Sequence, residues 1–226
     1  MTEAQCRTVP VSLPPHGGDG LLVLPAAPTG IVVFAHGSGS SRLSPRNTFV
    51  AEALQHAGLA TLLFDLLTER EAMHRVNVFD IPLLAERLDD AATWLTHHPS
   101  TRTLPLGLFG ASTGSAAALV AAAARPDVRA IVSRGGRPDL AGDVLDRVAA
   151  PTLLIVGGHD PEVLSLNRTA CHRLRCERRL EVVPGASHLF EETGALEAVV
   201  ALARTWFLHH LPPAAAEAGR AVHRSA

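Results

Sequence analysis

Residues 106–120, with the sequence LGLFGASTGSAAALV, constrain the fold more than any other segment. An apolar run that predicts a buried strand ends at Gly110, and small residues that favour a helix follow Gly114. The turn between them reads G-x-S-x-G, with Ser112 at its centre. Such a turn is so tight that the serine lies in strained backbone with its hydroxyl clear of the sheet, and a side chain at either glycine would clash. The segment therefore predicts a strand–turn–helix unit that presents Ser112 as a nucleophile.

Strands and helices alternate along most of the chain, which predicts a mostly parallel central sheet with helices on both faces. One α/β domain over residues 1–226 is expected, with a core of about 7–211 and a flexible tail at 212–226. A polar loop is expected from Glu69 to Asn77. The expected strands are 7–13, 20–24, 30–35, 60–65, 104–109, 129–133, 152–156 and 179–183, and the expected helices are 45–56, 78–97, 113–124, 138–148, 161–174 and 192–210.

The connection between strands 129–133 and 152–156 has room for no inserted lid, since it is only about 18 residues long. We therefore expect no cap domain and an open, shallow site. In a mostly parallel sheet the carboxyl ends of the strands meet along one edge, and sites form there. The partners of Ser112 are accordingly sought just after strands.

Composition excludes several chemistries. The 226 residues include no Lys and no Tyr, so Schiff-base catalysis, a Walker-type phosphate lysine and a tyrosine acid are ruled out. The net charge of −2 argues against nucleic-acid or anionic-membrane partners. Three cysteines cannot all pair, and no long apolar run is present, so a cytoplasmic protein with reduced thiols is expected. We expect no cofactor, no metal site, a small-molecule substrate and a monomer or homodimer.

A serine nucleophile needs a base, an acid that orients the base, and donors for the oxyanion. His188 is the one histidine between the last expected strand and the last expected helix, which makes it the candidate base. Asp160 follows strand 152–156 and is the candidate acid, with Asp139 and Asp143 as rivals that are better placed to decorate helix 138–148. The chain order Ser, Asp, His is that of α/β-hydrolases.

The two oxyanion donors are sought at the turn and in the glycine-rich loop after strand 30–35. The Thr113 N–H follows the nucleophile at a helix N-terminus, where the helix dipole favours negative charge. The second donor is expected to be the Ser38 N–H, with Gly39 as the alternative, and Gly37 and Gly39 let the backbone approach the substrate. His36 is expected to hold this loop through hydrogen bonds rather than to take part in catalysis.

Together these motifs resemble the α/β-hydrolase superfamily, and within it the dienelactone hydrolase-like group. The resemblance is carried by HGSGSS at 36–41, FDLLTE at 64–69, GASTG at 110–114, SRGGRPDL at 133–140, VGGHD at 156–160 and PGASHLFEE at 184–192. It implies an α/β-hydrolase fold with Ser112, Asp160 and His188 as the triad. The group's nucleophile is a cysteine, so Ser112 is a departure that favours ordinary ester hydrolysis. The chain also resembles hydrolase halves that are sometimes joined to phosphoribosyltransferase domains, and no such partner domain is present in this sequence.

Some alternatives remain open at this stage. Arg134 and Arg137 follow a strand and either bind a substrate carboxylate or phosphate or pair with nearby aspartates. A small serine carboxylesterase is the main hypothesis for function. A thioesterase with the same triad and a ligand-binding protein without turnover are the alternatives. A dinucleotide-binding loop is excluded because Arg42 stands where that fingerprint needs glycine.

Overall fold

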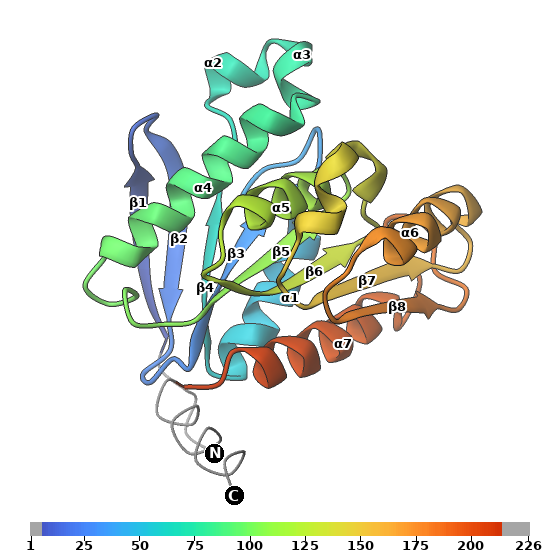
Figure 1. Cartoon of the computed structure of the whole chain (residues 1–226). Helices are drawn as coiled ribbons and strands as arrows, with labels where there is room; N and C mark the ends of the chain where they lie inside the picture. Colours follow the sequence, from blue (N-terminus) through green and yellow to red (C-terminus); the bar gives the residue numbers. More distant parts are fainter. Residues whose placement is uncertain (1–5, 214–226) are drawn as a thin grey trace, which may run out of the picture.

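The computed structural model describes residues 6–213, so most of the expected tail at 212–226 lies outside the described residues. Eight strands form one sheet in the order β1-β2-β4-β3-β5-β6-β7-β8 (Figure 1). The strands are β1 (Arg7–Leu13), β2 (Gly18–Leu24), β3 (Gly30–Ala35), β4 (Leu59–Phe64), β5 (Leu106–Ala111), β6 (Val128–Arg134), β7 (Thr152–Gly157) and β8 (Arg178–Val183). The helices are α1 (Pro45–His56), α2 (Glu69–Ala72), α3 (Arg75–Val78), α4 (Ile81–His97), α5 (Thr113–Ala124), the 3₁₀ helix η1 (Pro138–Arg147), α6 (Pro161–Arg173) and α7 (Ala195–His210).

Strand pairing confirms the predicted mostly parallel sheet. β2 runs antiparallel to both β1 and β4, and the other neighbouring strands are parallel. β3, β4, β5 and β7 are buried along their whole length, as expected of strands covered on both faces. Parallel pairing brings the ends of β3, β5, β6 and β7 to one edge of the sheet, the place where the sequence puts the site.

Two helical layers bury the two faces of this sheet (Figure 1). On one face α4, α5, η1 and α6 pack over a core that includes Leu88 and Leu119. On the other face α1 and α7 pack over a core that includes Val50 and Phe207. Within residues 6–213 no helix combines the length and apolarity that crossing a bilayer requires.

The connection from β4 to α4 differs from the expected polar loop at 69–77. It contains two short helices, α2 and α3, which lie at the outer end of α4 (Figure 1). The helix predicted from residue 78 begins at Ile81 instead, because the Asp80 side chain accepts a hydrogen bond from Leu83 N and caps it there. The last helix likewise starts at Ala195 rather than 192.

Between β6 and β7 the described chain holds only η1 and short turns, so the prediction of no lid at this position is confirmed. The segment expected as helix 138–148 consists of two short 3₁₀ pieces, because Gly142, with a φ of 65°, breaks the helical path between them. The connection between β6 and β7 therefore does not cover this edge of the sheet. Residues of α2 and α3 border it instead, beside the loop that follows β3.

Candidate active site

The turn at residues 110–114, called the elbow here, has the strained geometry expected of a nucleophile turn. Ser112 joins β5 to α5 with φ 50° and ψ −121°, and its N–H donates to the Arg134 carbonyl at 3.2 Å. Ser112 stands at the N-terminal cap of α5, where a serine hydroxyl usually accepts a backbone N–H, yet its side chain makes no capping bond. The Ser112 hydroxyl has no hydrogen-bond partner among residues 6–213, so it is available for another role.

Both elbow glycines are required by close contacts. A β-carbon at Gly110 would lie 2.4 Å from Ser115 Cα, and one at Gly114 would lie 2.2 Å from the Ala35 carbonyl oxygen. These neighbours are backbone atoms and cannot swing aside. The elbow therefore lets α5 pack directly on β5 and on the end of β3, as the sequence motif predicts.

His188 and Asp160 lie in contact, as the sequence predicts. His188 Nδ1 is 2.7 Å from Asp160 Oδ2, with the Asp160 side chain 15% exposed and the His188 side chain 39% exposed. Asp160 caps α6 by position, but its carboxylate makes no capping bond and turns to the imidazole instead. Of the rival acids, Asp139 accepts two hydrogen bonds from Arg137, and Asp143 pairs with Arg173 at 3.3 Å. Of the three candidate acids, Asp160 is the one in contact with His188.

Backbone hydrogen bonds hold the loops that carry this pair together. The Gly158 N–H donates to Val183 O and the His159 N–H donates to Ala186 O, each at 2.9 Å, which joins the loops after β7 and β8. Gly135, directly after β6, packs against His188: a β-carbon there would lie 3.6 Å from His188 Cε1. The end of β6 therefore contacts both the elbow and the His188 loop.

In the loop after β3, where the second oxyanion donor is expected, the Ser38 N–H already has a hydrogen-bond partner. The Ser38 N–H, chosen as the second donor, donates to Thr113 Oγ1 at 2.8 Å. Thr113 is 4% exposed, so this bond ties the loop to the elbow. The Thr113 N–H and the Gly39 N–H, by contrast, form no hydrogen bond within residues 6–213. Ser38 becomes a donor to an oxyanion only if its N–H is shared with Thr113 or released from it.

His36 has the structural role predicted for it. Its Nδ1 lies 3.0 Å from Gly37 O, and its Nε2 accepts from the Leu66 N–H at 3.2 Å, which joins the loops after β3 and β4. Burial lowers the pKa of His36 below its ordinary value of 6.5. A neutral imidazole that donates from Nδ1 and accepts at Nε2 satisfies both contacts.

A hollow of about 1060 Å³ opens beside the oxyanion loop. Ser38 and Thr113 belong to its wall, whereas Ser112, Asp160 and His188 do not. Residues of α2 and α3, among them Glu69, Arg75 and Val78, form part of the wall of this hollow. Phe79 lines the hollow, and Met73 does not.

The two candidate substrate-binding arginines, Arg134 and Arg137, differ in their partners: one is in an ion pair and the other is not. Arg137 pairs with Asp139 through two hydrogen bonds of 2.9 and 2.7 Å, which is the ion-pair alternative. Arg134 is 7% exposed and bonds to Asn47 Oδ1 at 3.3 Å, with no carboxylate partner among the described residues. Nothing in the sequence around residue 134 signals this isolation, because its neighbours come from α1 and from the His188 loop.

Sequence reasoning missed several residues that shape the site. The buried Asn167 donates to Gly136 O at 2.9 Å, and the buried Ser115 donates to Gly110 O at 2.8 Å. Both hold the backbone around the elbow. Ser115 follows the motif by one residue and was within reach of local reasoning, but Asn167 depends on how α6 packs.

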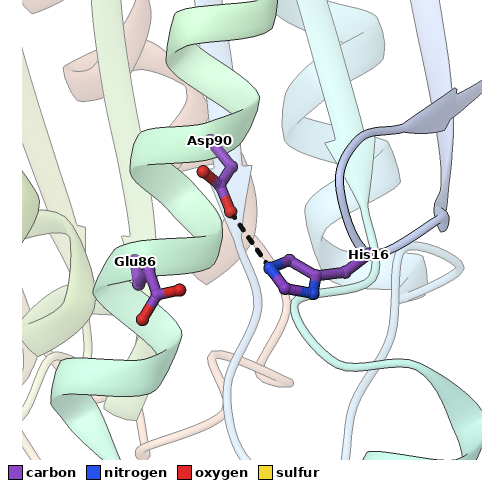
Figure 2. A group of neighbouring side chains, drawn as sticks. All are labelled: His16, Glu86 and Asp90. Carbon is purple, nitrogen blue, oxygen red and sulfur yellow. Dashed lines mark ion pairs between the residues drawn. The ribbon is translucent and has the colours of Figure 1, made fainter.

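One group of side chains in the described part of the chain has the composition of a metal site. His16, Glu86 and Asp90 place their ligand atoms within 4.8 Å of one another, and Figure 2 shows His16 directed at Asp90. Burial raises the pKa of Asp90, and the charges of His16 and Arg87 partly offset that. The Arg87 guanidinium already lies 3.3 Å from Glu86 and 4.0 Å from Asp90. The positive charge that a metal ion would bring to these carboxylates is therefore already supplied by Arg87.

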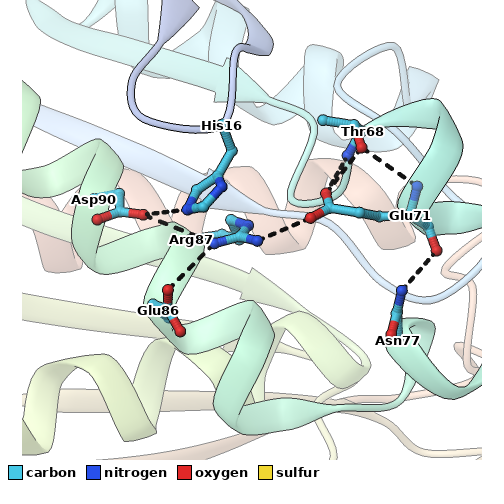
Figure 3. A network of polar contacts seen from close by, with 7 residues as sticks. All are labelled: His16, Thr68, Glu71, Asn77, Glu86, Arg87 and Asp90. Atoms are coloured by element: carbon cyan, nitrogen blue, oxygen red, sulfur yellow. Dashed lines mark hydrogen bonds and ion pairs between the residues drawn. The ribbon is translucent and has the colours of Figure 1, made fainter.

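Arg87 also links α4 to the wall of the hollow (Figure 3). It pairs with Glu71 of α2 at 2.8 Å, and the Thr68 N–H and hydroxyl both donate to the same carboxylate. Burial raises the pKa of Glu71, but the bonds from Thr68 and Arg87 outweigh it, and the net pKa is lowered. Asn77 donates to Glu71 O at 2.9 Å and fastens α3 as well. This network fixes the position of the wall beside the site.

Known proteins share this architecture and sequence. The dienelactone hydrolase family matches residues 19–208 of the chain. The structure is similar to a dienelactone hydrolase from Anabaena variabilis, with 58% identity, a TM-score of 0.88, and coverage of 92% of this chain and 99% of that one. Est1E from Butyrivibrio proteoclasticus shares the fold at 15% identity, with a TM-score of 0.74 and coverage of 89% and 98% of the two chains.

A curated Mycobacterium tuberculosis protein, named "Putative phosphoribosyl transferase", is 63% identical over 193 residues. The match covers 85% of this chain and 44% of the relative, so the chain spans less than half the length of that protein.

Proposed function

Because the chain belongs to the dienelactone hydrolase family, we propose that it is a serine hydrolase that cleaves small carboxylic esters through an acyl-enzyme on Ser112. One observation carries the proposal: the His188–Asp160 contact of 2.7 Å at the sheet edge that also presents the Ser112 elbow. A carboxylate on Nδ1 leaves Nε2 of the imidazole as the proton acceptor. The unbonded Ser112 hydroxyl is the group from which it would take that proton.

In the proposed first half-reaction, His188 removes the Ser112 proton as the oxygen attacks the ester carbonyl. The carbonyl C=O becomes a C–O⁻ in a tetrahedral intermediate. The alcohol then leaves with the proton from His188, and the acyl group stays on Ser112. In the second half-reaction water attacks the acyl-enzyme by the same steps, and the acid is released.

The Thr113 N–H is the first oxyanion donor, since it is unbonded at the N-terminus of α5 where the helix dipole adds to it. The second donor comes from the loop after β3. The bond from Ser38 N to Thr113 Oγ1 places this loop over the elbow, and either Ser38 or the unbonded Gly39 N–H then faces the oxyanion.

The hollow beside the oxyanion loop supports a substrate with an apolar portion on that side. Its wall includes Leu43, Val78 and Phe79, which are apolar, together with Arg75, whose guanidinium lies 5.9 Å from the Phe79 ring centre. A volume of about 1060 Å³ accommodates groups well beyond acetyl.

A thioesterase with the same triad is the second candidate function, because the proposed chemistry accepts either leaving group. The transferase name belongs to a relative of which this chain spans only 44%, whereas the hydrolase family matches residues 19–208 of this chain. We therefore assign no transferase step to this chain.

The test is turnover of p-nitrophenyl acetate and p-nitrophenyl butyrate by the wild type, Ser112→Ala and Ser165→Ala. Ser165 is an exposed serine on α6 and serves as the matched control. We expect hydrolysis by the wild type and by Ser165→Ala, and its loss in folded Ser112→Ala. Full activity of Ser112→Ala would overturn the proposal, and matched oxygen and thio esters separate the two candidate functions.

A further inference from the structure

Arg134 is a buried cation whose charge the described protein does not neutralise. It is 7% exposed, no carboxylate lies within ion-pair distance among residues 6–213, and its Nε is buried without a hydrogen-bond partner. Within the described residues its guanidinium donates one hydrogen bond, to the neutral Asn47 side chain at 3.3 Å. Burying a charge without a counter-ion is costly, so such a group persists where something outside the protein completes it.

A second arginine, Arg46, lies near enough to Arg134 for its charge to act on it. Arg46 also has a buried Nε with no partner, and its exposed end pairs with Glu191 at 3.3 Å. Burial, and after it the nearby charge of Arg46, lowers the pKa of Arg134 to about 10, so Arg134 is still a cation at neutral pH. Two like charges held close repel each other, and an anion placed between them would relieve this.

The surroundings add further donors. Arg46 and Asn47 belong to the first turn of α1, a 12-residue helix whose N-terminus favours negative charge. The Arg134 Nη1 forms no hydrogen bond within the described residues and is not among the buried unpartnered atoms, so it is the guanidinium nitrogen with access to solvent. A forked guanidinium with free N–H groups suits a phosphate or a carboxylate.

We propose that Arg134 and Arg46, at the N-terminus of α1, form a binding site for an oxyanion, and that its ligand is a phosphate dianion or a phosphate monoester. A dianion is favoured over a carboxylate because two guanidinium groups and a helix N-terminus face it, while Glu191 neutralises one of them only in part. The proposal does not depend on the ester chemistry, although Arg134 lies at the end of β6 next to the elbow. The Phe190 ring, 6.0 Å from the Arg134 guanidinium carbon, connects it to the loop that carries His188.

The test compares thermal unfolding of the wild type and Arg134→Met at pH 8.0 in sodium phosphate, sodium acetate and sodium chloride of equal ionic strength. In chloride, Arg134→Met should be at least as stable as the wild type, since the substitution removes an uncompensated buried charge but keeps an apolar stem. In 10 mM phosphate the wild-type Tm should rise by about 3 °C or more, and that of Arg134→Met should not. Arg173→Met, which removes an exposed arginine on α6, should keep the phosphate response.

Isothermal titration with inorganic phosphate gives the stoichiometry, expected to be one per chain. Arg46→Met should weaken binding at least tenfold and provides a second variant if Arg134→Met fails to fold. A wild-type Tm that is no higher in phosphate than in chloride would overturn the proposal. Phosphate binding that survives in both variants would also overturn it. A larger response to acetate than to phosphate would overturn the dianion assignment. These readouts need no turnover, so they stand apart from the test of ester hydrolysis.

Discussion

The bond from the Ser38 N–H to Thr113 Oγ1 allows a quantitative prediction for Thr113→Val. Valine keeps the shape of threonine but has no acceptor, so it leaves the Ser38 N–H unbonded beside a residue that is 4% exposed. Because Ser38 is exposed, water can take the place of the lost acceptor, and the loss is that of one ordinary hydrogen bond, about 0.5–1.5 kcal/mol. For a domain of this size that lowers Tm by roughly 1–6 °C.

The same substitution should slow acylation. The loop after β3 loses the tie that places its backbone N–H groups over the elbow, and displacement of one oxyanion donor costs on the order of a hundredfold in rate when it is complete. We expect the acylation rate constant, measured by stopped flow with p-nitrophenyl butyrate, to fall at least about tenfold. Thr113→Ser is the control because it keeps the acceptor oxygen. If Thr113→Val matched Thr113→Ser in both Tm and acylation rate, the reasoning about this bond would be refuted.

Three further predictions follow from other contacts. Asp160→Asn removes the carboxylate that orients His188 and should lower kcat by on the order of 10³–10⁴ with little change in Tm, so steady-state activity close to wild type would contradict its role. Gly114→Ala places a β-carbon 2.2 Å from the Ala35 carbonyl oxygen and should destabilise the fold by more than about 3 kcal/mol in urea titrations. Gly142→Ala, which meets no atom within 4 Å, should cost only about 1–2 kcal/mol for its left-handed backbone, and equal losses in the two glycine variants would exclude the steric explanation. Because burial lowers the pKa of His36, the unfolded chain binds a proton that the folded chain does not, so the free energy of unfolding should fall as pH drops below 6.5. His36→Gln should show a shallower fall between pH 7 and 5, and an unchanged slope in urea titrations would count against this.

The elbow and the His188–Asp160 contact could be predicted because their signals are local. Glycines at 110 and 114 mark a turn with no room for side chains, and Asp160 and His188 each follow a strand in a parallel sheet. Parallel pairing then brings these positions to one edge whatever the details of packing. The pairing of Arg137 with Asp139 was also within reach, since the two residues lie two positions apart.

The wall of the hollow was missed, although a local signal was present. Thr68 and Glu71 form a capping box, in which the Thr68 hydroxyl accepts from the Glu71 N–H and the Glu71 carboxylate accepts from the Thr68 N–H. This pattern indicates a helix start even where no hydrophobic periodicity supports one. A helix of four residues has too few positions to show periodicity, so hydrophobic periodicity alone predicts a loop here.

Other features depend on contacts between distant segments and could not be found from sequence. The Ser38 N–H meets Thr113 because the loop after β3 folds over the elbow, 75 residues away in the chain. Arg134 lacks an acid because α1 and the His188 loop, rather than η1, cover the end of β6. The aspartates near Arg134 in sequence made an ion pair the natural expectation, and tertiary packing removed it.

The central claim is that Ser112 carries the acyl group, and intact-protein mass spectrometry after rapid mixing with p-nitrophenyl butyrate tests it most directly. The account predicts a butyryl adduct on the wild type that maps to the peptide containing Ser112 and is absent from folded Ser112→Ala. An adduct of the same yield on Ser112→Ala, or ester turnover by the wild type without any adduct at Ser112, would contradict it.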